Sequence, residues 1–223
     1  LGLAARQPRV TITPMGLYAE TIFHCLLDKA LGHPNIMRRR QALVSQATGE
    51  VLEIGFGSGA TLPFYDPAIV TSLTVVEPSE GMNRRAAAHL AGSPVPIKSV
   101  PGAGERLPFA DASFDTVVCC LTLCSVQDVG QVLAEVRRVL KTGGRFLFME
   151  HVLSDDPERQ RWQQRLNLIQ KVVGVGCNLN RPSAQLVRDA GFSLDPMPVQ
   201  EEEYAFGALK KLSPLVMGSA IKA

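Results

Sequence analysis

The chain has 223 residues, of which 46% are hydrophobic, so it can bury one substantial core and falls within the size range of a single α/β domain. Its 23 basic and 21 acidic residues nearly balance, which argues against the basic surface that nucleic-acid binding requires. A small molecule is therefore the expected ligand, and no nucleic acid is expected as a partner. We find no run of 18 apolar residues and no signal peptide, and we expect a cytoplasmic protein.

The chain has five cysteines, an odd number that does not suit a disulfide framework. Cys119, Cys120 and Cys124 share one apolar stretch. Adjacent cysteines on a strand point to opposite faces, and no histidine lies near them in the sequence. We therefore expect no metal site, and we interpret the cysteines as small apolar side chains in a reducing compartment.

The first expected elements in chain order are helices. Between residues 14 and 47, apolar side chains recur with a helical period that breaks near residues 32–34. Residues 1–48 are therefore expected to form a helical N-terminal cap. The three arginines at 38–40 are interpreted as a solvated helix face, which is the usual role of a short basic run.

After Gly49, strand and helix patterns alternate regularly. Strands are expected at 51–54, 73–77, 95–100, 114–121 and 145–152, with helices from about residue 60, over 79–89 and over 126–140. Continuous apolar strands between amphipathic helices are typical of a parallel sheet that is covered on both faces. We therefore expect a doubly wound α/β sheet.

The last third of the chain is expected to complete this sheet in one compact unit, residues 49–223. It contains a polar helix over 156–172, a turn-rich segment to 183, a short helix to 190, and strands near 192–198 and 216–222. The polar helix has one apolar face, formed by Trp162, Leu166, Ile169 and Val173. Core packing is its expected role. The alternative is that this face and the N-terminal helices around Tyr18 and His24 cover a site.

The stretch VLEIGFGSGA, residues 51–60, contains a glycine loop. Gly55, Gly57 and Ala60 match the spacing of a dinucleotide-binding loop. Glu53 lies at the carboxyl end of the first strand, where its charge would repel a pyrophosphate and attract a ligand with an ammonium and a sulfonium. S-adenosylmethionine is such a ligand. Gly57 or Gly59 is expected to provide space or a backbone angle that a Cβ would forbid.

Glu77 ends the second strand, where a carboxylate can accept hydrogen bonds from both hydroxyls of a ribose. The alternative is an ordinary acid between a strand and the next helix. Pro78 and Met82 are expected to form apolar walls around an adenine. A dinucleotide-dependent oxidoreductase would need a second domain, and the roughly seventy residues after the fifth strand are too few for one.

Four segments together resemble the motifs of class I S-adenosylmethionine-dependent methyltransferases over about residues 50–152: VLEIGFGSG, TVVEPSEGM, AGERLPFADASFDTVVCC and EVRRVLKTGGRFLFMEHV. The resemblance implies a Rossmann-like doubly wound seven-stranded sheet, S-adenosylmethionine as methyl donor and S-adenosylhomocysteine as product. It assigns the methionine end to Glu53, Gly55, Gly57 and Gly59, the ribose to Glu77, the adenine side to Gly104 and Glu105, and the ammonium to the backbone of Cys120 and Leu121. Ala103 departs from the pattern, because many relatives have an aspartate there.

A narrower resemblance links FYDP (64–67), VVCCLTLCSV (117–126), MEHV (149–152) and GCNLNR (176–181) to the methyltransferase-like protein seven group, which methylates alkyl thiols. It implies a thiol S-methyltransferase that acts on a small apolar thiol. Animal members carry a membrane-anchoring N-terminal segment, which this chain does not show, so membrane association is unsupported. The alternative is C- or O-methylation of a quinone-like or other natural-product acceptor.

His151, just past the fifth strand, is the candidate to deprotonate or orient the thiol, with a structural hydrogen bond as the alternative. Cys124 is expected to line the acceptor pocket without acting as a nucleophile. Asn178 and Arg181 are expected to fix the substrate or lower the pKa of its thiol. The alternative for Asn178 or Asn180 is to cap the helix that follows Pro182.

Overall fold

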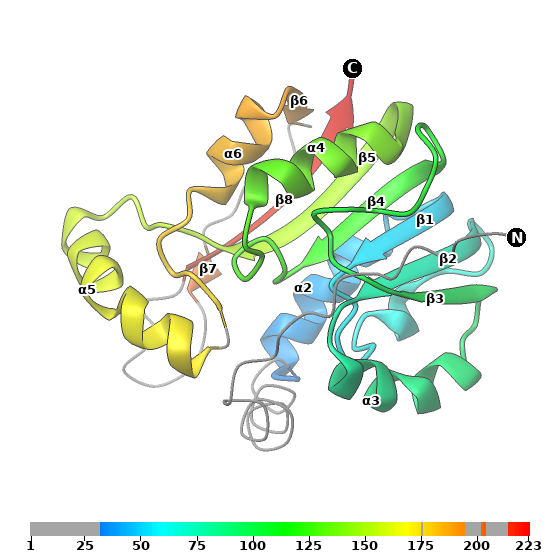
Figure 1. Ribbon diagram of the computed structural model, residues 1–223, viewed down its shortest axis with the longest axis horizontal. Helices are drawn as coiled ribbons and strands as arrows, with labels where there is room; N and C mark the ends of the chain where they lie inside the picture. Colours follow the sequence, from blue (N-terminus) through cyan, green and yellow to red (C-terminus); the bar gives the residue numbers. More distant parts are fainter. Residues whose placement is uncertain (1–31, 175, 195–201, 204–213) are drawn as a thin grey trace, which may run out of the picture.

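A mixed β-sheet forms the centre of the protein in a computed structural model, which describes residues 32–174, 176–194, 202–203 and 214–223 (Figure 1). The strand order is β3-β2-β1-β4-β5-β8-β6, with β7 paired to β8 outside this path. β1 to β5 run parallel, and β8 is antiparallel to β5, β6 and β7. The strands are β1 Gly49–Ile54, β2 Val70–Glu77, β3 Ile97–Pro101, β4 Phe114–Cys120, β5 Leu140–His151, β6 Phe192–Leu194, β7 Glu202–Glu203 and β8 Pro214–Lys222. The seven strands of the main path confirm the predicted doubly wound sheet.

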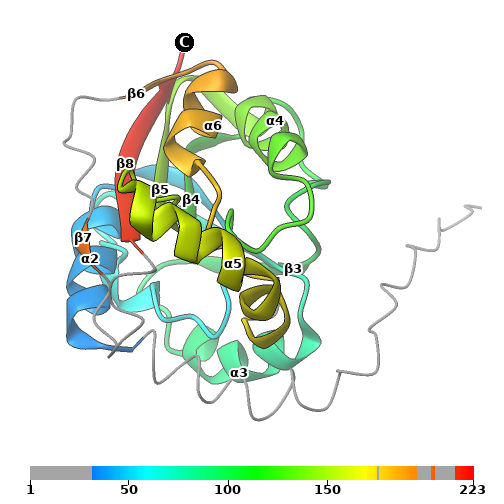
Figure 2. The same ribbon diagram turned by 90° about the vertical axis from the view of Figure 1, so that its left-hand side faces the viewer.

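Helices cover both faces of the sheet. α4 and α6 lie on one side and α2 and α3 on the other, as Figure 1 and Figure 2 show. The helices are α2 Pro34–Val44, α3 Glu80–Ala91, α4 Val129–Val139, α5 Pro157–Val173 and α6 Ser183–Asp189. Within the described ranges, none of these helices has both the length and the apolar character that a bilayer crossing needs.

Side-chain caps explain why three of the predicted helices begin where they do. Ser79 accepts a hydrogen bond from the amide of Met82, and Asp128 accepts one from the amide of Gln131. Asp156 caps α5 in the same way. Such caps satisfy amides that have no partner within the helix.

The helix predicted from about residue 60 is wrong. This segment forms only a 3-10 turn, η2 Leu62–Phe64. Pro63 and Pro67 explain the difference, because proline suits the first turn of a helix but disfavours helical backbone in the residue before it. One turn therefore fits between them.

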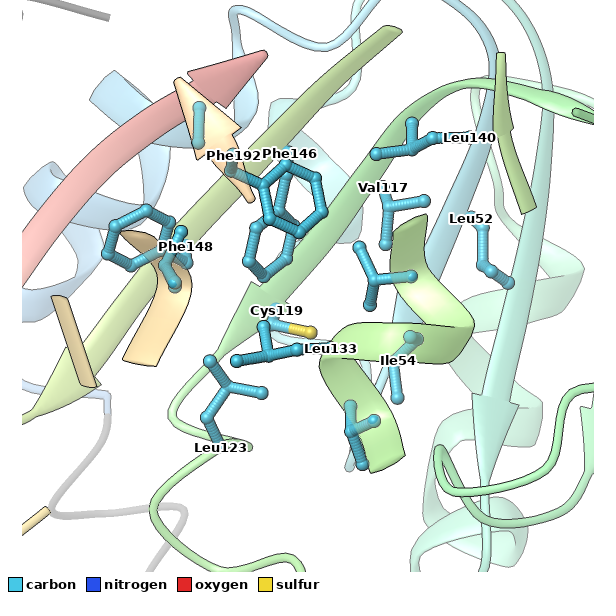
Figure 3. Packing of buried hydrophobic residues seen from close by; sticks show 14 of the residues in the cluster. Leu52, Ile54, Val117, Cys119, Leu123, Leu133, Leu140, Phe146, Phe148 and Phe192 are labelled. Carbon is cyan, nitrogen blue, oxygen red and sulfur yellow. The ribbon is translucent and has the colours of Figure 1, made fainter. Parts of the chain in front are cut away.

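Alternate residues of β4 enter two separate cores. Val117 and Cys119 belong to the cluster under α4 and α6, whereas Val118 and Cys120 belong to the cluster under α2 and α3. The prediction that the adjacent cysteines face opposite sides is confirmed. Figure 3 shows the first cluster, in which Phe146 stacks on Phe148 with ring centroids 5.4 Å apart.

Arg40 is buried, although the sequence predicted a solvated basic face. It is 5% exposed, on the side of α2 that carries the buried residues Ile36, Leu43 and Val44. Residues 36, 40, 43 and 44 share one helix face at 3.6 residues per turn, which explains the burial. Residues 1–31 of the predicted cap, with Tyr18 and His24, lie outside the described residues.

α5 buries polar side chains and exposes apolar ones. Gln163 and Asn167 are buried, whereas Trp162 is 48% exposed and Ile169 is 61% exposed. The predicted core packing of the apolar face is therefore wrong for Trp162 and Ile169. Gln163 explains the inversion, because its side chain accepts from the amide of Ser154 and donates to two main-chain carbonyls, those of Val152 and Leu179.

Candidate active site

A pocket of about 1040 Å³ lies at the carboxyl ends of β1, β2, β4 and β5. The ends of parallel strands meet at one edge of a sheet, where α/β proteins bind their ligands. Twelve of the predicted site residues line this pocket: Glu53, Gly55, Gly57, Glu77, Pro78, Met82, Gly104, Glu105, Cys120, Leu121, Cys124 and His151. Gly59, Asn178 and Arg181 are not among its lining residues.

Glu53 is held in the pocket wall by two hydroxyl groups. Glu53 is 1% exposed, and its carboxylate accepts hydrogen bonds from Thr61 Oγ1 at 2.8 Å and from Tyr65 Oη at 2.8 Å. Burial raises the pKa of Glu53 to about 7, while Tyr65, Thr61 and the charge of Arg40 act in the opposite direction. The charge of this carboxylate therefore changes near neutral pH.

Sequence reasoning missed the partners of Glu53. Tyr65 lies in the FYDP segment, which carries a family resemblance but no residue pattern of a binding site, and the basic run that contains Arg40 predicts a solvated helix face. Arg40 and Thr61 also line the pocket. The signal for Arg40 was its position among apolar residues at helical spacing.

The glycine loop contains one glycine that is closely packed, Gly55, and one that faces open space, Gly57. Gly55 has a φ of +74°, and a Cβ added there would overlap the side chain of Thr122. Gly57 has a φ of +59° and nothing within 4 Å of its Cβ position. The first glycine is therefore required by packing inside the protein, and the second leaves room for a ligand at the backbone.

Glu77 links the second strand to the glycine loop. One carboxylate oxygen accepts from the amide of Gly57 and the other from the amide of Ser79, both at 2.9 Å. A carboxylate has about four acceptor sites, so these two amides orient it and are compatible with acceptance from a diol.

The next part of the wall is formed by Gly104 and Glu105. A Cβ at position 104 would lie 2.8 Å from a methyl group of Ile54, so glycine is needed there for close packing. Glu105 accepts from the amides of Gln127 and Asp128 at 3.0 and 3.4 Å. These bonds fix the segment that enters α4.

A strained turn follows β4, with a φ of +59° at Leu121. Glu150 of β5 is buried and accepts from the next three amides, those of Thr122, Leu123 and Cys124, at 2.9, 2.9 and 3.1 Å. Burial raises the pKa of Glu150, against the opposite effect of these amides. Positive φ in a residue with a side chain is typical of functional sites. The signal that sequence reasoning missed was an acid inside an otherwise apolar strand.

Asn178 and Arg181 donate hydrogen bonds to the main chain of the segment after β4, which contributes to the pocket wall. Asn178 Nδ2 donates to the carbonyl of Cys124 at 2.9 Å. The Arg181 guanidinium donates to the carbonyls of Leu123 and Val126. The alternative of a helix cap is wrong, because α6 has Pro182 at its N-cap and no side-chain cap.

Two cysteines and a histidine meet in the lining of the pocket. The sulfur of Cys177 lies 3.7 Å from that of Cys124 and 3.6 Å from Nδ1 of His151. One potential metal-ligand atom from each residue falls within 4.8 Å of the other two. The sequence showed no histidine near Cys124, but the fold places His151 there, and Cys177 was not predicted at all.

The thiols of this cluster differ in acidity. The contact with Cys124 lowers the pKa of Cys177, with a smaller contribution from the charge of Arg181. The contact with Cys177 and burial raise the pKa of Cys124. Burial lowers the pKa of His151, but Cys124 and the charge of Glu150 raise it overall. Cys177 is therefore the thiol that ionises more readily.

Comparison with known proteins gives the family. A model of the Methyltransferase domain family matches residues 52–148. Thiol S-methyltransferase TMT1B of Rattus norvegicus is 34% identical over 178 residues, which cover 77% of this chain and 70% of that protein. Thiol S-methyltransferase TMT1A of Homo sapiens is 37% identical over 147 residues, which cover 64% of this chain and 59% of that protein.

The fold is also found among solved structures. The crystal structure of YcgJ from Bacillus subtilis superposes with a TM-score of 0.63 at 19% identity, covering 82% of this chain and 96% of that chain. At this identity the likeness establishes the fold alone. With the sequence relatives, it leads to one conclusion: the chain belongs to the family of S-adenosylmethionine-dependent methyltransferases that includes the thiol S-methyltransferases TMT1A and TMT1B.

Proposed function

We propose that this protein transfers the methyl group of S-adenosylmethionine to the sulfur of a small apolar thiol. The names of TMT1A and TMT1B support a thiol acceptor. The observation that carries the proposal is the position of His151. His151 lines the same pocket as the glycine loop and lies beside Cys124 and Cys177.

Two observations indicate that the pocket residues suit S-adenosylmethionine. Glu53 is a buried carboxylate in the wall, suited to an ammonium, and Gly57 leaves open space where a ligand can approach the backbone. In the proposal, Glu53, Gly55 and Gly57 bind the methionine end, and Gly59 shapes the loop. Glu77 binds the ribose, Pro78, Met82, Gly104 and Glu105 surround the adenine, and the backbone of Cys120 and Leu121 faces the ammonium.

The proposed mechanism is an in-line displacement in which the protein contributes alignment and exclusion of water. When bound, S-adenosylmethionine supplies an electrophilic methyl group on a positively charged sulfur. His151 orients the acceptor sulfur and promotes loss of its proton. The acceptor's lone pair then forms the new S–C bond as the old one breaks. Direct transfer needs no covalent enzyme intermediate, so Cys124 lines the site and does not react.

A panel of acceptors tests this proposal. The protein is incubated with S-adenosylmethionine and, separately, with alkyl thiols, phenols, amines and quinols, and the products are measured by mass spectrometry. We expect methyl thioethers with an equal amount of S-adenosylhomocysteine. Methylation of oxygen, nitrogen or carbon acceptors without any thiol product would refute the thiol assignment and favour the alternative of C- or O-methylation.

A further inference from the structure

We propose that Cys124, His151 and Cys177 form a zinc site with three protein ligands and a fourth position that opens to the pocket. Two thiolates and one imidazole are a known ligand set for catalytic zinc, which keeps one position for water or substrate. All three residues line the pocket. The zinc site rests on geometry alone, whereas the role given below to its fourth position rests on the proposed function.

Two of the three distances between the ligand atoms match the edges of a zinc tetrahedron. Zinc lies about 2.3 Å from a thiolate and about 2.0–2.1 Å from an imidazole nitrogen, so a tetrahedral site has edges of about 3.8 Å between two sulfurs and about 3.6 Å between sulfur and nitrogen. The corresponding distances here are 3.7 Å between Cys177 and Cys124, and 3.6 Å between Cys177 and His151. The third distance, between the ligand atoms of Cys124 and His151, is within 4.8 Å.

The fold holds the cluster by hydrogen bonds around its ligands. The amide of Cys124 donates to Glu150 at 3.1 Å. Its carbonyl accepts from the amide and side chain of Asn178 at 2.8 and 2.9 Å, and Asn178 is the neighbour of Cys177. The backbone of Cys124 is therefore hydrogen-bonded to the residue next to Cys177, which fixes the positions of the two cysteines relative to each other. Supporting bonds of this kind orient metal ligands and raise affinity.

The fourth position would bind the acceptor thiol as its thiolate. The acceptor R–SH would lose its proton to water when its sulfur joins the metal, so His151 would promote this loss through the metal that it binds. That sulfur then forms a bond to the methyl carbon, and the electron pair of the broken C–S bond stays on the donor sulfur. The product thioether is neutral and binds zinc weakly, so it leaves. No oxidant or reductant is needed.

Cobalt provides a direct spectroscopic test of the site. The full chain is stripped with a chelator under reducing conditions, titrated with Co²⁺ and followed by visible absorption, with Zn²⁺ as competitor. We expect one Co²⁺ per chain, the strong bands of a tetrahedral site, a thiolate charge-transfer band, and displacement by zinc. The absence of these bands would overturn the proposal.

Matched variants separate ligation from folding. Cys124→Ser, Cys177→Ser and His151→Ala are expected to weaken Co²⁺ binding by about tenfold or more, because each removes a ligand. Cys177→His keeps a ligand, so it should retain the metal with a weaker thiolate band. Cys119→Ala changes a cysteine in the core below α4 and should bind as the unmodified chain does. Circular dichroism checks the fold of each variant. Unchanged binding in both serine variants would overturn the site.

Further measurements distinguish failure of the zinc site from failure of the proposed function. A short alkyl thiol should change the Co²⁺ spectrum, and no change would refute the role of the fourth position. Cobalt binding without thiol methylation would preserve the site and refute the function. Full methylation by chelated, metal-free protein would refute the zinc role and preserve the function. If protein treated with a reductant still contained a Cys124–Cys177 disulfide and bound no metal, the zinc site would be overturned.

Discussion

Glu53 is expected to make cofactor affinity depend on pH. Its pKa is raised to about 7, so the side chain is mostly neutral at pH 5.5 and about half ionised at pH 7. Only the ionised form attracts an ammonium, so affinity for S-adenosylhomocysteine should rise between pH 5.5 and 7. An α-amino group keeps its proton over most of this range. Isothermal titration calorimetry across the range measures the effect.

The matched control for this prediction is Glu53→Gln. It keeps an acceptor for Thr61 and Tyr65 but removes the titrating charge. Binding should be weaker and nearly constant from pH 5.5 to 7. An equally steep pH dependence in the variant would show that another group is responsible.

The two loop glycines should respond differently to alanine. Gly57→Ala meets no neighbour, so it should fold with a loss of about 1–2 kcal/mol for the left-handed backbone, and bind the cofactor about tenfold or more weakly. Gly55→Ala overlaps Thr122 and should mainly reduce folded yield. Urea denaturation and calorimetry separate the two. Unchanged cofactor affinity in Gly57→Ala would contradict the assignment of this loop.

Helix α5 owes its orientation to polar contacts. Gln163 satisfies one main-chain amide and two carbonyls, at 2.7–2.9 Å. Gln163→Leu should lower the free energy of unfolding by about 2–4 kcal/mol, because it leaves these buried groups without partners. Urea denaturation measures the loss.

Leu168→Gln is the control on the same helix. Leu168 is 75% exposed, and a surface substitution should change the free energy of unfolding by less than about 0.5 kcal/mol. If Gln163→Leu were equally mild, the stability of α5 would come from contacts other than these hydrogen bonds.

The turn after β4 depends on β5 through Glu150. Glu150→Gln replaces one acceptor oxygen by a donor, which cannot pair with the amides of Thr122, Leu123 and Cys124 as the carboxylate does. We expect a loss of about 2–3 kcal/mol in unfolding free energy, and lower thiol turnover, because the turn carries Cys124. Glu50→Gln, at an exposed acid, is the matched control and should change little. Normal stability in Glu150→Gln would contradict the anchoring role.

The central sheet was predictable from the sequence because its signals are local. Apolar strands and capping residues such as Ser79 and Asp156 define elements within a few positions of sequence. The burial of the polar face of α5 was not predictable, because the hydrogen-bond partners of Gln163 lie in other segments. The cluster of Cys124, His151 and Cys177 likewise depends on β4, β5 and the loop after α5 meeting in space. Local patterns contain no distances between such segments.

Cofactor binding should stabilise the fold as a unit, because the pocket is built from the ends of four strands. A ligand at 100 times its dissociation constant adds about 2.7 kcal/mol. For a chain of this size that corresponds to a rise of roughly 5–10 °C in the melting temperature. Differential scanning fluorimetry with S-adenosylhomocysteine should show this rise, and NADH should not. Glu77→Ala should reduce the shift, because the carboxylate at the end of β2 would no longer accept from the ribose or hold the amide of Gly57. A larger shift with NADH than with S-adenosylhomocysteine would contradict the assignment of this pocket to the methyl donor.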